Sequence, residues 1–165
     1  MAMLDELLSI KTFREQQAES RLQVARISLA DAHRTEDLAT DELARYRDYA
    51  RQQEDAGYRA LFERAVKVRD IAELHQDIAI LRMTEQQYRR ELDQARAQRE
   101  SAQTDHQLAD SAARDARTTR EKFDELVARD HAVRARTAEY REELEYEELS
   151  AIVREREEWS ETPDA

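Results

Sequence analysis

Apolar and alanine residues recur at spacings of three and four along most of the chain, and this periodicity constrains the fold more than any other feature. These spacings place each series on one face of an α-helix, as in the heptad repeat of a coiled coil. No alternation typical of a β-strand is present. We therefore predict an all-α protein whose two long helices meet along one seam. The seam positions are Leu22, Ala25, Leu29, Ala32, Glu36, Ala39, Leu43, Tyr46, Ala50, Gln53, Gly57 and Ala60, then Ile71, Leu74, Ile78, Leu81, Glu85, Tyr88, Leu92, Ala95, Arg99, Ala102, His106, Ala109, Ala113, Ala116, Arg120, Phe123 and Val127.

The composition favours an elongated coiled coil over a round domain. Charged residues make up 39% of the 165 residues, and much of the 40% hydrophobic share is alanine. A round core needs more large apolar side chains than this, whereas a thin seam needs fewer. The chain holds one glycine, one proline and no cysteine, so a disulfide scaffold is excluded. We predict a single helical hairpin over residues 1–165, because two long helices in one chain usually pack antiparallel.

Two sites could begin the second helix, since Asp70 to Glu73 and Thr84 to Gln87 both read as capping boxes. In two antiparallel helices, the two residue numbers of every facing pair add up to the same value. A sum of 131 mostly sets large seam residues against small ones, for example Leu81 with Ala50 and Leu74 with Gly57, and it places Tyr88 opposite Leu43. A sum of 166 leaves like charges and voids. We therefore predict a first helix over about 3–62, a turn over about 62–69 and a second helix over about 70–159, capped by Asp70, with a frayed tail over 160–165.

The second helix is then longer than the first, and residues beyond about 130 have no partner within the chain. Residues 130–165 carry twelve acidic residues against five arginines, about seven of the net charges of −11. An apolar stripe nevertheless continues along this segment at Tyr140, Leu144, Ile152 and Val153. Two interpretations stand: a surface for a partner protein, or a solvated tail.

No group of residues points to catalysis, a metal or another cofactor. The four histidines lie at least 25 residues apart, and no glycine-rich phosphate loop is present. The acidic balance disfavours nucleic acid as a partner. The longest apolar run, Ile78 to Leu81, is too short to span a membrane, and the first residues lack the features of a secretory signal. We expect a non-enzymatic cytoplasmic protein without an integral membrane segment.

Aromatic residues are concentrated in the turn-proximal third of the predicted hairpin. They either cover a loosely packed hairpin end or form an exposed patch for a partner. These residues are Tyr46, Tyr49, Tyr58, Phe62 and Tyr88.

Two stretches resemble the YscO family of type III secretion proteins. They are "MLDELLSIKTFREQQAESRLQVAR", from residue 3, and "LARYRDYARQQEDAGYRALFERAVKVRDIAEL", from residue 43. The flagellar FliJ protein is similar at a greater distance. The resemblance implies a stalk protein that is similar to the coiled coil of the rotary-ATPase gamma subunit. The implied partners are a hexameric secretion ATPase, an export gate protein and secretion chaperones, on the cytoplasmic side of an inner-membrane secretion apparatus. A generic coiled-coil spacer or chaperone-like hairpin unrelated to secretion is the alternative.

The resemblance also suggests which surfaces bind these partners. In this family the end that bears both termini enters the ATPase, and the turn-proximal part contacts the gate. The candidates for gate or chaperone binding are Leu43, Tyr46, Tyr49, Tyr58, Phe62, Leu81 and Tyr88. The candidates for ATPase binding are Leu4, Leu7, Leu8, Ile10, Phe123, Leu126, Val127, Tyr140 and Leu144.

Overall fold

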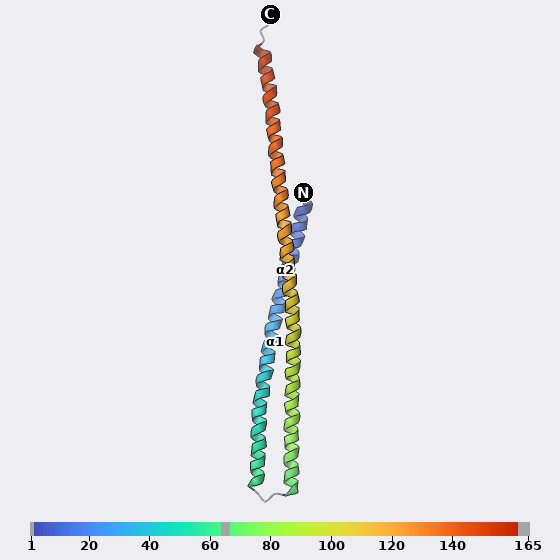
Figure 1. Ribbon diagram of the computed structural model, residues 1–165, viewed down its shortest axis with the longest axis vertical. Helices are drawn as coiled ribbons and strands as arrows, with labels where there is room; N and C mark the ends of the chain where they lie inside the picture. Colours follow the sequence, from blue (N-terminus) through green and yellow to red (C-terminus); the bar gives the residue numbers. More distant parts are fainter. Residues whose placement is uncertain (1, 64–66, 162–165) are drawn as a thin grey trace. The chain divides into compact units, whose positions relative to one another are not determined.

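The computed structural model describes residues 2–63 and 67–161, and it contains two helices. Helix α1 spans Ala2–Phe62, with 61 residues, and helix α2 spans Val68–Glu161, with 94 residues (Figure 1). No strand occurs among these described residues. Both helices are rich in Ala, Leu, Glu, Gln and Arg, the residues with the highest helix propensity. The predicted all-α helical hairpin with a longer second helix is therefore confirmed.

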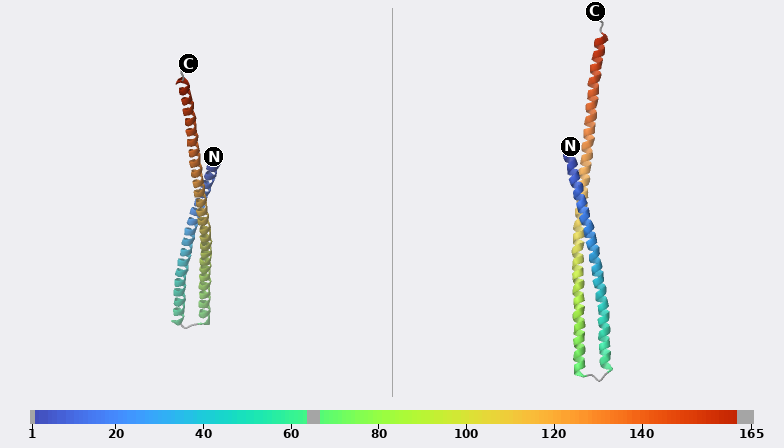
Figure 2. Two further views of the ribbon diagram at one scale, coloured as in Figure 1. Left: turned by 45° about the horizontal axis from the view of Figure 1, so that its top comes forward. Right: turned by 180° about the vertical axis from the view of Figure 1, so that it is seen from behind.

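The chain divides into two units, and each contains part of both helices. One unit is Gln17–Ala113, in which α1 and α2 run antiparallel on either side of the connection between them. The other is Met1–Gln16 with Arg114–Ala165, in which α2 extends well past the first residues of α1 (Figure 2). We call the unpaired part of α2, residues 132–161, the overhang.

The buried hydrophobic residues of both units all belong to the predicted seam. Each exposes less than a tenth of its surface, whereas most other described residues are exposed. Burial along a single stripe is what two helices achieve when each side chain inserts between residues of the facing helix. The buried hydrophobic residues are Leu22, Leu43, Ile78, Leu92, Ala95, Ala113 and Val127.

The start of α2 differs from the capping prediction. The helix begins at Val68, so Asp70 lies inside its first turn, where its Oδ2 accepts the backbone N–H of Lys67 at 3.2 Å. Asp70 therefore makes the capping-box hydrogen bond that runs from the third helical residue back to the backbone N–H of the N-cap residue. The prediction that Asp70 is itself the N-cap residue was wrong. Thr84 lies within α2 and donates its hydroxyl to the carbonyl of Ile80 at 3.0 Å. Residues 64–66 of the predicted turn and 162–165 of the predicted frayed tail lie outside the described residues.

The contacts between α1 and α2 scatter about the predicted register, some falling on it and others a few residues away. Tyr88 was expected opposite Leu43, but its ring stacks on Tyr46 at a centroid distance of 4.9 Å. The constant sum of 131 would set Arg120 beside Lys11, a pair of like charges; instead Arg120 bonds to Glu15. The predicted neighbours Gly57 and Leu74 do approach each other, since a Cβ on Gly57 would overlap Leu74 Cδ1. The contacts of Gly57 with Leu74 and of Arg47 with Glu85 thus follow the predicted register to within one residue, whereas those of Tyr46 with Tyr88 and of Glu15 with Arg120 are offset by three or four.

Candidate partner-binding surfaces

An aromatic cluster joins α1 and α2 in the turn-proximal part of the unit Gln17–Ala113. The ring of Tyr46 stacks on Tyr88 with planes 27° apart and lies 5.9 Å from the ring of Tyr49. Its hydroxyl donates a hydrogen bond to the backbone carbonyl of Leu81 at 3.2 Å. Tyr46, Tyr88 and Leu81 are half-buried. The structure thus brings together four of the seven candidates for gate or chaperone binding.

The other candidates in this part of the hairpin differ in how much surface they offer. Leu43 is 5% exposed, so its side chain is used in packing between the helices. Tyr49, Tyr58 and Phe62 are 51%, 40% and 87% exposed. Because a partner can touch only what solvent can reach, these three aromatic residues are the accessible members of the set.

A surface hollow beside the aromatic cluster was not anticipated from the sequence. It has a volume of about 480 Å³, and its lining runs from Tyr49 and Leu81 to Gly57. A second hollow of about 230 Å³ shares Gly57, Leu74 and Asp77 with the first and adds Asp70 and Glu73. Leu74 approaches α1 closely at Gly57, and both residues line each of the two hollows. The seam pattern predicted that Leu74 faces Gly57, but it did not predict the hollows on either side of this contact.

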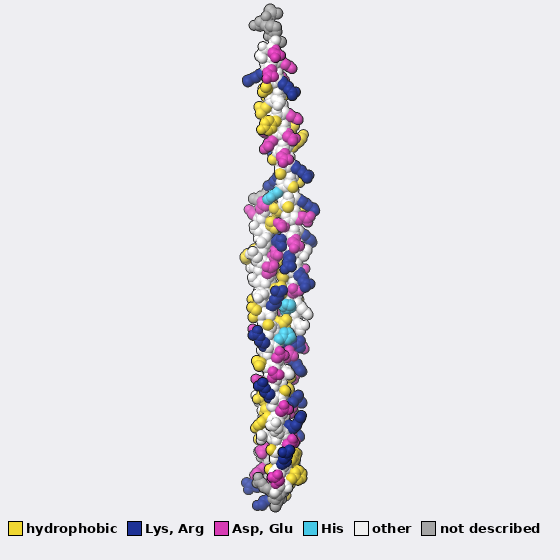
Figure 3. All heavy atoms as spheres, turned by 90° about the vertical axis from the view of Figure 1, so that its left-hand side faces the viewer, with side chains coloured by type: hydrophobic (Ala, Val, Ile, Leu, Met, Phe, Trp, Pro, Cys, Tyr) yellow, Lys and Arg dark blue, Asp and Glu magenta, His cyan; other side chains and the backbone are white. Residues whose placement is uncertain are grey.

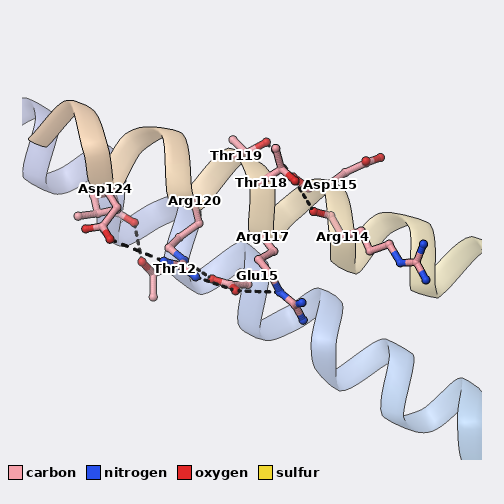
Figure 4. Close-up of polar contacts among 10 residues, drawn as sticks. Thr12, Glu15, Arg114, Asp115, Arg117, Thr118, Thr119, Arg120 and Asp124 are labelled. Carbon is pink, nitrogen blue, oxygen red and sulfur yellow. Dashed lines mark hydrogen bonds and ion pairs between the residues drawn. The ribbon is translucent and has the colours of Figure 1, made fainter.

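A buried carboxylate anchors the paired part of the other unit. Glu15 Oε2 accepts a 2.6 Å hydrogen bond from Arg120 Nε, and Arg117 Nε lies 4.0 Å from Glu15 Oε1 (Figure 4). The hydrogen bond from Arg120 lowers the pKa of Glu15; burial opposes this effect, and the charges of Arg120 and Arg117 add to it. The same hydrogen bond raises the pKa of Arg120. Glu15 is thus held ionised within the seam.

The same arrangement recurs in the unit Gln17–Ala113. Glu36 Oε2 accepts a 2.7 Å hydrogen bond from Arg99 Nε, and Arg96 Nε lies 3.9 Å from Glu36 Oε1. Glu36 follows Glu15 by 21 residues, and the two arginines precede Arg117 and Arg120 by the same number. This number is three heptads, so both sets occupy equivalent seam positions. We call them the paired clamps, and they explain why charged residues interrupt the seam at these places.

The candidates for ATPase binding near the first residues of α1 are mostly packed against α2. Val127 is buried, and Leu4, Leu7, Leu8 and Phe123 are half-buried. The ammonium group of Lys11 lies 5.3 Å from the centre of the Phe123 ring, a cation–π contact. Ile10 and Leu126 are 47% and 46% exposed and remain accessible. The accessible apolar surface of this unit lies chiefly elsewhere.

That surface is the overhang. The contact of His131 Nε2 with Asp5 Oδ1, at 3.3 Å, lies at its base, and every residue from 132 to 161 is exposed. Tyr140 and Leu144 are 62% and 40% exposed, and six further large apolar residues of the overhang were not among the candidates. Yellow side chains are visible among acidic ones along this part of α2 (Figure 3). The six are Val133, Tyr146, Leu149, Ile152, Val153 and Trp159.

The described residues provide neither a metal centre nor a membrane span. Among them, no three histidine, cysteine or acidic side chains come close enough to hold a metal ion. Neither α1 nor α2, over the described ranges, contains a stretch long and apolar enough to cross a membrane. The surfaces described above consist of apolar, aromatic and acidic side chains.

Comparison with known proteins gives a consistent result. The family model of the type III secretion protein YscO matches residues 4–152. The crystal structure of the type III secretion protein YscO from Vibrio parahaemolyticus is similar to this chain, with a TM-score of 0.80 and 27% sequence identity. The match covers 89% of this chain and 92% of the Vibrio chain. No curated protein matches the sequence.

Proposed function

Because the chain belongs to the YscO family of type III secretion proteins, we propose that it is the central stalk and adaptor of a bacterial type III export apparatus. In this proposal it couples a hexameric secretion ATPase to the export gate and binds secretion chaperones, without catalysing a reaction itself. It acts in the cytoplasm, at the periphery of the inner-membrane apparatus. Membership in the family removes the basis for the alternative, a spacer or chaperone-like hairpin unrelated to secretion.

The observation that carries the proposal is the exposed apolar surface of the overhang. Eight large apolar side chains between residues 133 and 159 are 40% exposed or more. Apolar surface on this scale marks a site of protein association in a water-soluble structure. The adjoining paired residues Ile10 and Leu126 extend this surface toward α1. We assign the overhang and these two residues to the ATPase.

The aromatic residues of the unit Gln17–Ala113 support the second half of the proposal. Tyr49, Tyr58 and Phe62 are exposed, and Tyr49 lines the hollow at Gly57. Tyr46 and Tyr88 stack across the two helices. Aromatic side chains with an apolar body and an exposed edge are typical of the contacts that dominate protein interfaces. We assign the three exposed aromatic residues to gate or chaperone binding, with Tyr46, Tyr88, Leu43 and Leu81 as their support.

The test is the rate of ATP hydrolysis by the ATPase of the same secretion system, measured with the full chain and with a chain that ends at Asp130. The full chain should stimulate hydrolysis and the truncated chain should not. A matched double variant, Tyr49→Ala with Phe62→Ala, should stimulate hydrolysis fully but bind the gate or chaperone more weakly. Full stimulation by the truncated chain at physiological salt would contradict the assignment of the overhang to the ATPase.

A further inference from the structure

Helix α1 carries a second apolar series, separate from the seam. Ile10 and Val24 are fourteen residues apart, and so are Phe13 and Ile27. Because fourteen residues are two heptads, each pair keeps one direction along a helix of a coiled coil. Ile10 is 47% exposed, Phe13 58%, Val24 64% and Ile27 54%, whereas Leu22 of the seam is 7% exposed. We call these four exposed residues the outer stripe.

The surface that carries the outer stripe contains no acidic residue between Ser9 and Ala30. Counted in heptads from the seam residue Leu22, the stripe and its neighbours on both sides occupy four adjacent positions around α1. From Ser9 to Ala30 these positions hold thirteen residues, all exposed, and none is Asp or Glu. The whole chain, by contrast, has 38 acidic residues among 165. The thirteen are Ser9, Ile10, Phe13, Arg14, Gln16, Gln17, Ser20, Arg21, Gln23, Val24, Ile27, Ser28 and Ala30.

Two arginines border the outer stripe on one side. Arg14 and Arg21 are seven residues apart, so they share one heptad position. Neither has Asp or Glu three or four positions away along α1, the spacings at which side chains of one helix pair. A second copy packed antiparallel, so that the apolar residues match one another, would set Arg14 of one copy beside Arg21 of the other. Like charges oppose that pairing, whereas carboxylates of a different helix would be attracted.

We propose that the outer stripe binds an acidic amphipathic helix of a partner protein, which packs on α1 as a third helix. Apolar heptad residues of the partner contact Phe13, Val24 and Ile27, and its carboxylates, seven residues apart, pair with Arg14 and Arg21. Glutamate or aspartate on α1 bounds the acid-free surface at both ends, at residues 6 and 31, so the docked helix is about 30 Å long.

This surface is distinct from the two that the proposed function uses. It includes neither the overhang nor the exposed aromatic residues near the turn, so the inference goes beyond the assigned roles of both. Ile10 alone is shared with the surface assigned to the ATPase, and the tests therefore leave it unchanged.

The first test measures the binding of two labelled synthetic peptides, each of about 22 residues, to the full chain by fluorescence anisotropy at physiological salt. Both peptides have leucine at their heptad seam positions, and the flanking positions are glutamate in one and glutamine in the other. The glutamate peptide should bind about fivefold more tightly or better. The double variant Phe13→Ser with Ile27→Ser should weaken its binding by about fivefold or more.

Two further variants separate charge from apolar contact. Arg14→Gln with Arg21→Gln should remove the preference for the glutamate peptide, and Leu108→Ser, at a position 66% exposed on α2, should leave binding unchanged. Circular dichroism should show the same helix content in every variant. Equal affinity for the two peptides, or full binding by the Phe13 and Ile27 double variant, would overturn the inference.

The second test is photo-crosslinking in cells that carry the cognate secretion apparatus. A benzophenone amino acid replaces Val24 in one strain and Leu108, as the control, in another. Mass spectrometry should place the Val24 crosslink in an acidic heptad segment of another protein, and a synthetic copy of that segment should bind the purified chain but not the Arg14 and Arg21 double variant. A basic segment, a second copy of this chain, the same capture at Leu108, or no capture would each overturn the inference.

Discussion

The paired and unpaired stretches of α2 both carry large apolar residues but use them differently. Between Leu74 and Val127 the large seam residues are buried or half-buried against α1, and Ile78, Leu92 and Val127 are less than a tenth exposed. In the overhang, residues of the same types are at least 40% exposed. Both stretches are helical, because Glu, Arg, Ala and Leu favour the helix whether or not a partner covers it. The paired stretch thus uses its apolar residues for folding, whereas the fold does not require those of the overhang.

The largest difference is expected from matched leucine truncations. Leu43→Ala removes a side chain that is 5% exposed, so the free energy of unfolding should fall by roughly 2–4 kcal/mol. Leu149→Ala removes one that is 59% exposed, and the change should stay within about 0.5 kcal/mol. Urea unfolding followed by circular dichroism measures both. Equal losses of unfolding free energy at Leu43 and Leu149 would show that the fold depends on both stretches alike.

A smaller effect is expected from the clamp at Glu15, and it should depend on pH. The pKa of Glu15 is lowered in the folded chain, so its ion pair contributes its full stability above the ordinary carboxyl pKa of about 4.3. That contribution is lost as the pH falls below this value and through the lowered pKa. Glu15→Gln should therefore destabilise the chain at pH 7, by less than Leu43→Ala, and the difference from the unchanged chain should shrink toward pH 3.

The control for this prediction is Glu42→Gln, an exposed change on the same helix. Thermal unfolding is measured for the three chains between pH 3 and pH 7. A Glu15→Gln deficit that stays constant over this range would show that packing, rather than charge, makes the contribution.

A still smaller effect is expected at Gly57, because two contributions oppose each other. Alanine in the middle of a helix is favoured over glycine by roughly 0.5–1 kcal/mol. The added methyl group would overlap Leu74 Cδ1, which must move toward the neighbouring hollow. Gly57→Ala should therefore change the free energy of unfolding by less than about 1 kcal/mol. A larger loss in urea unfolding would show that Leu74 cannot rearrange.

The smallest effect on stability should come from the largest deletion. A chain that ends at Asp130 keeps both paired clamps and every buried hydrophobic residue. Its thermal midpoint should match that of the full chain, although its total helix signal is lower. A clear fall in the midpoint would show that the overhang contributes to the fold, and it would remove the contrast between the two stretches.

Periodicity made the helices and the seam predictable, since spacings of three and four leave no other regular structure for residues such as Leu22 and Leu92. The first residue of α2 was not predictable from local rules. A carboxylate such as that of Asp70 can serve the first turn of a helix from more than one position. The ion pairs across the seam were not predicted, because size matching treats Glu36 and Arg99 as seam fillers. The ion pair between Glu36 and Arg99 can be recognised only once the two helices are arranged side by side.

The partner surfaces were predictable in part. An aromatic cluster near the turn was expected, and the seam series already separates the half-buried Tyr46, which belongs to it, from the exposed Tyr49, which does not. The contact between these two rings was not predictable from the series. In the overhang, the predicted stripe contained Tyr140, Leu144, Ile152 and Val153, all of which are exposed, and it left out Val133, Tyr146, Leu149 and Trp159. Apolar residues spread over a broad sector of a helix follow a single stripe poorly, so the stripe included only some of them.

The 21-residue spacing of the paired clamps limits how the length of such a chain can change. A seven-residue deletion in α1 between Glu15 and Glu36 would keep the seam on one face but move the two glutamates closer together by about 10 Å. Arg99 and Arg120 would then match only one of them. A matching seven-residue deletion between these arginines would restore both pairs. An insertion or deletion in α1 therefore requires a matching one in α2. Length variants that fold should gain or lose heptads in both helices together.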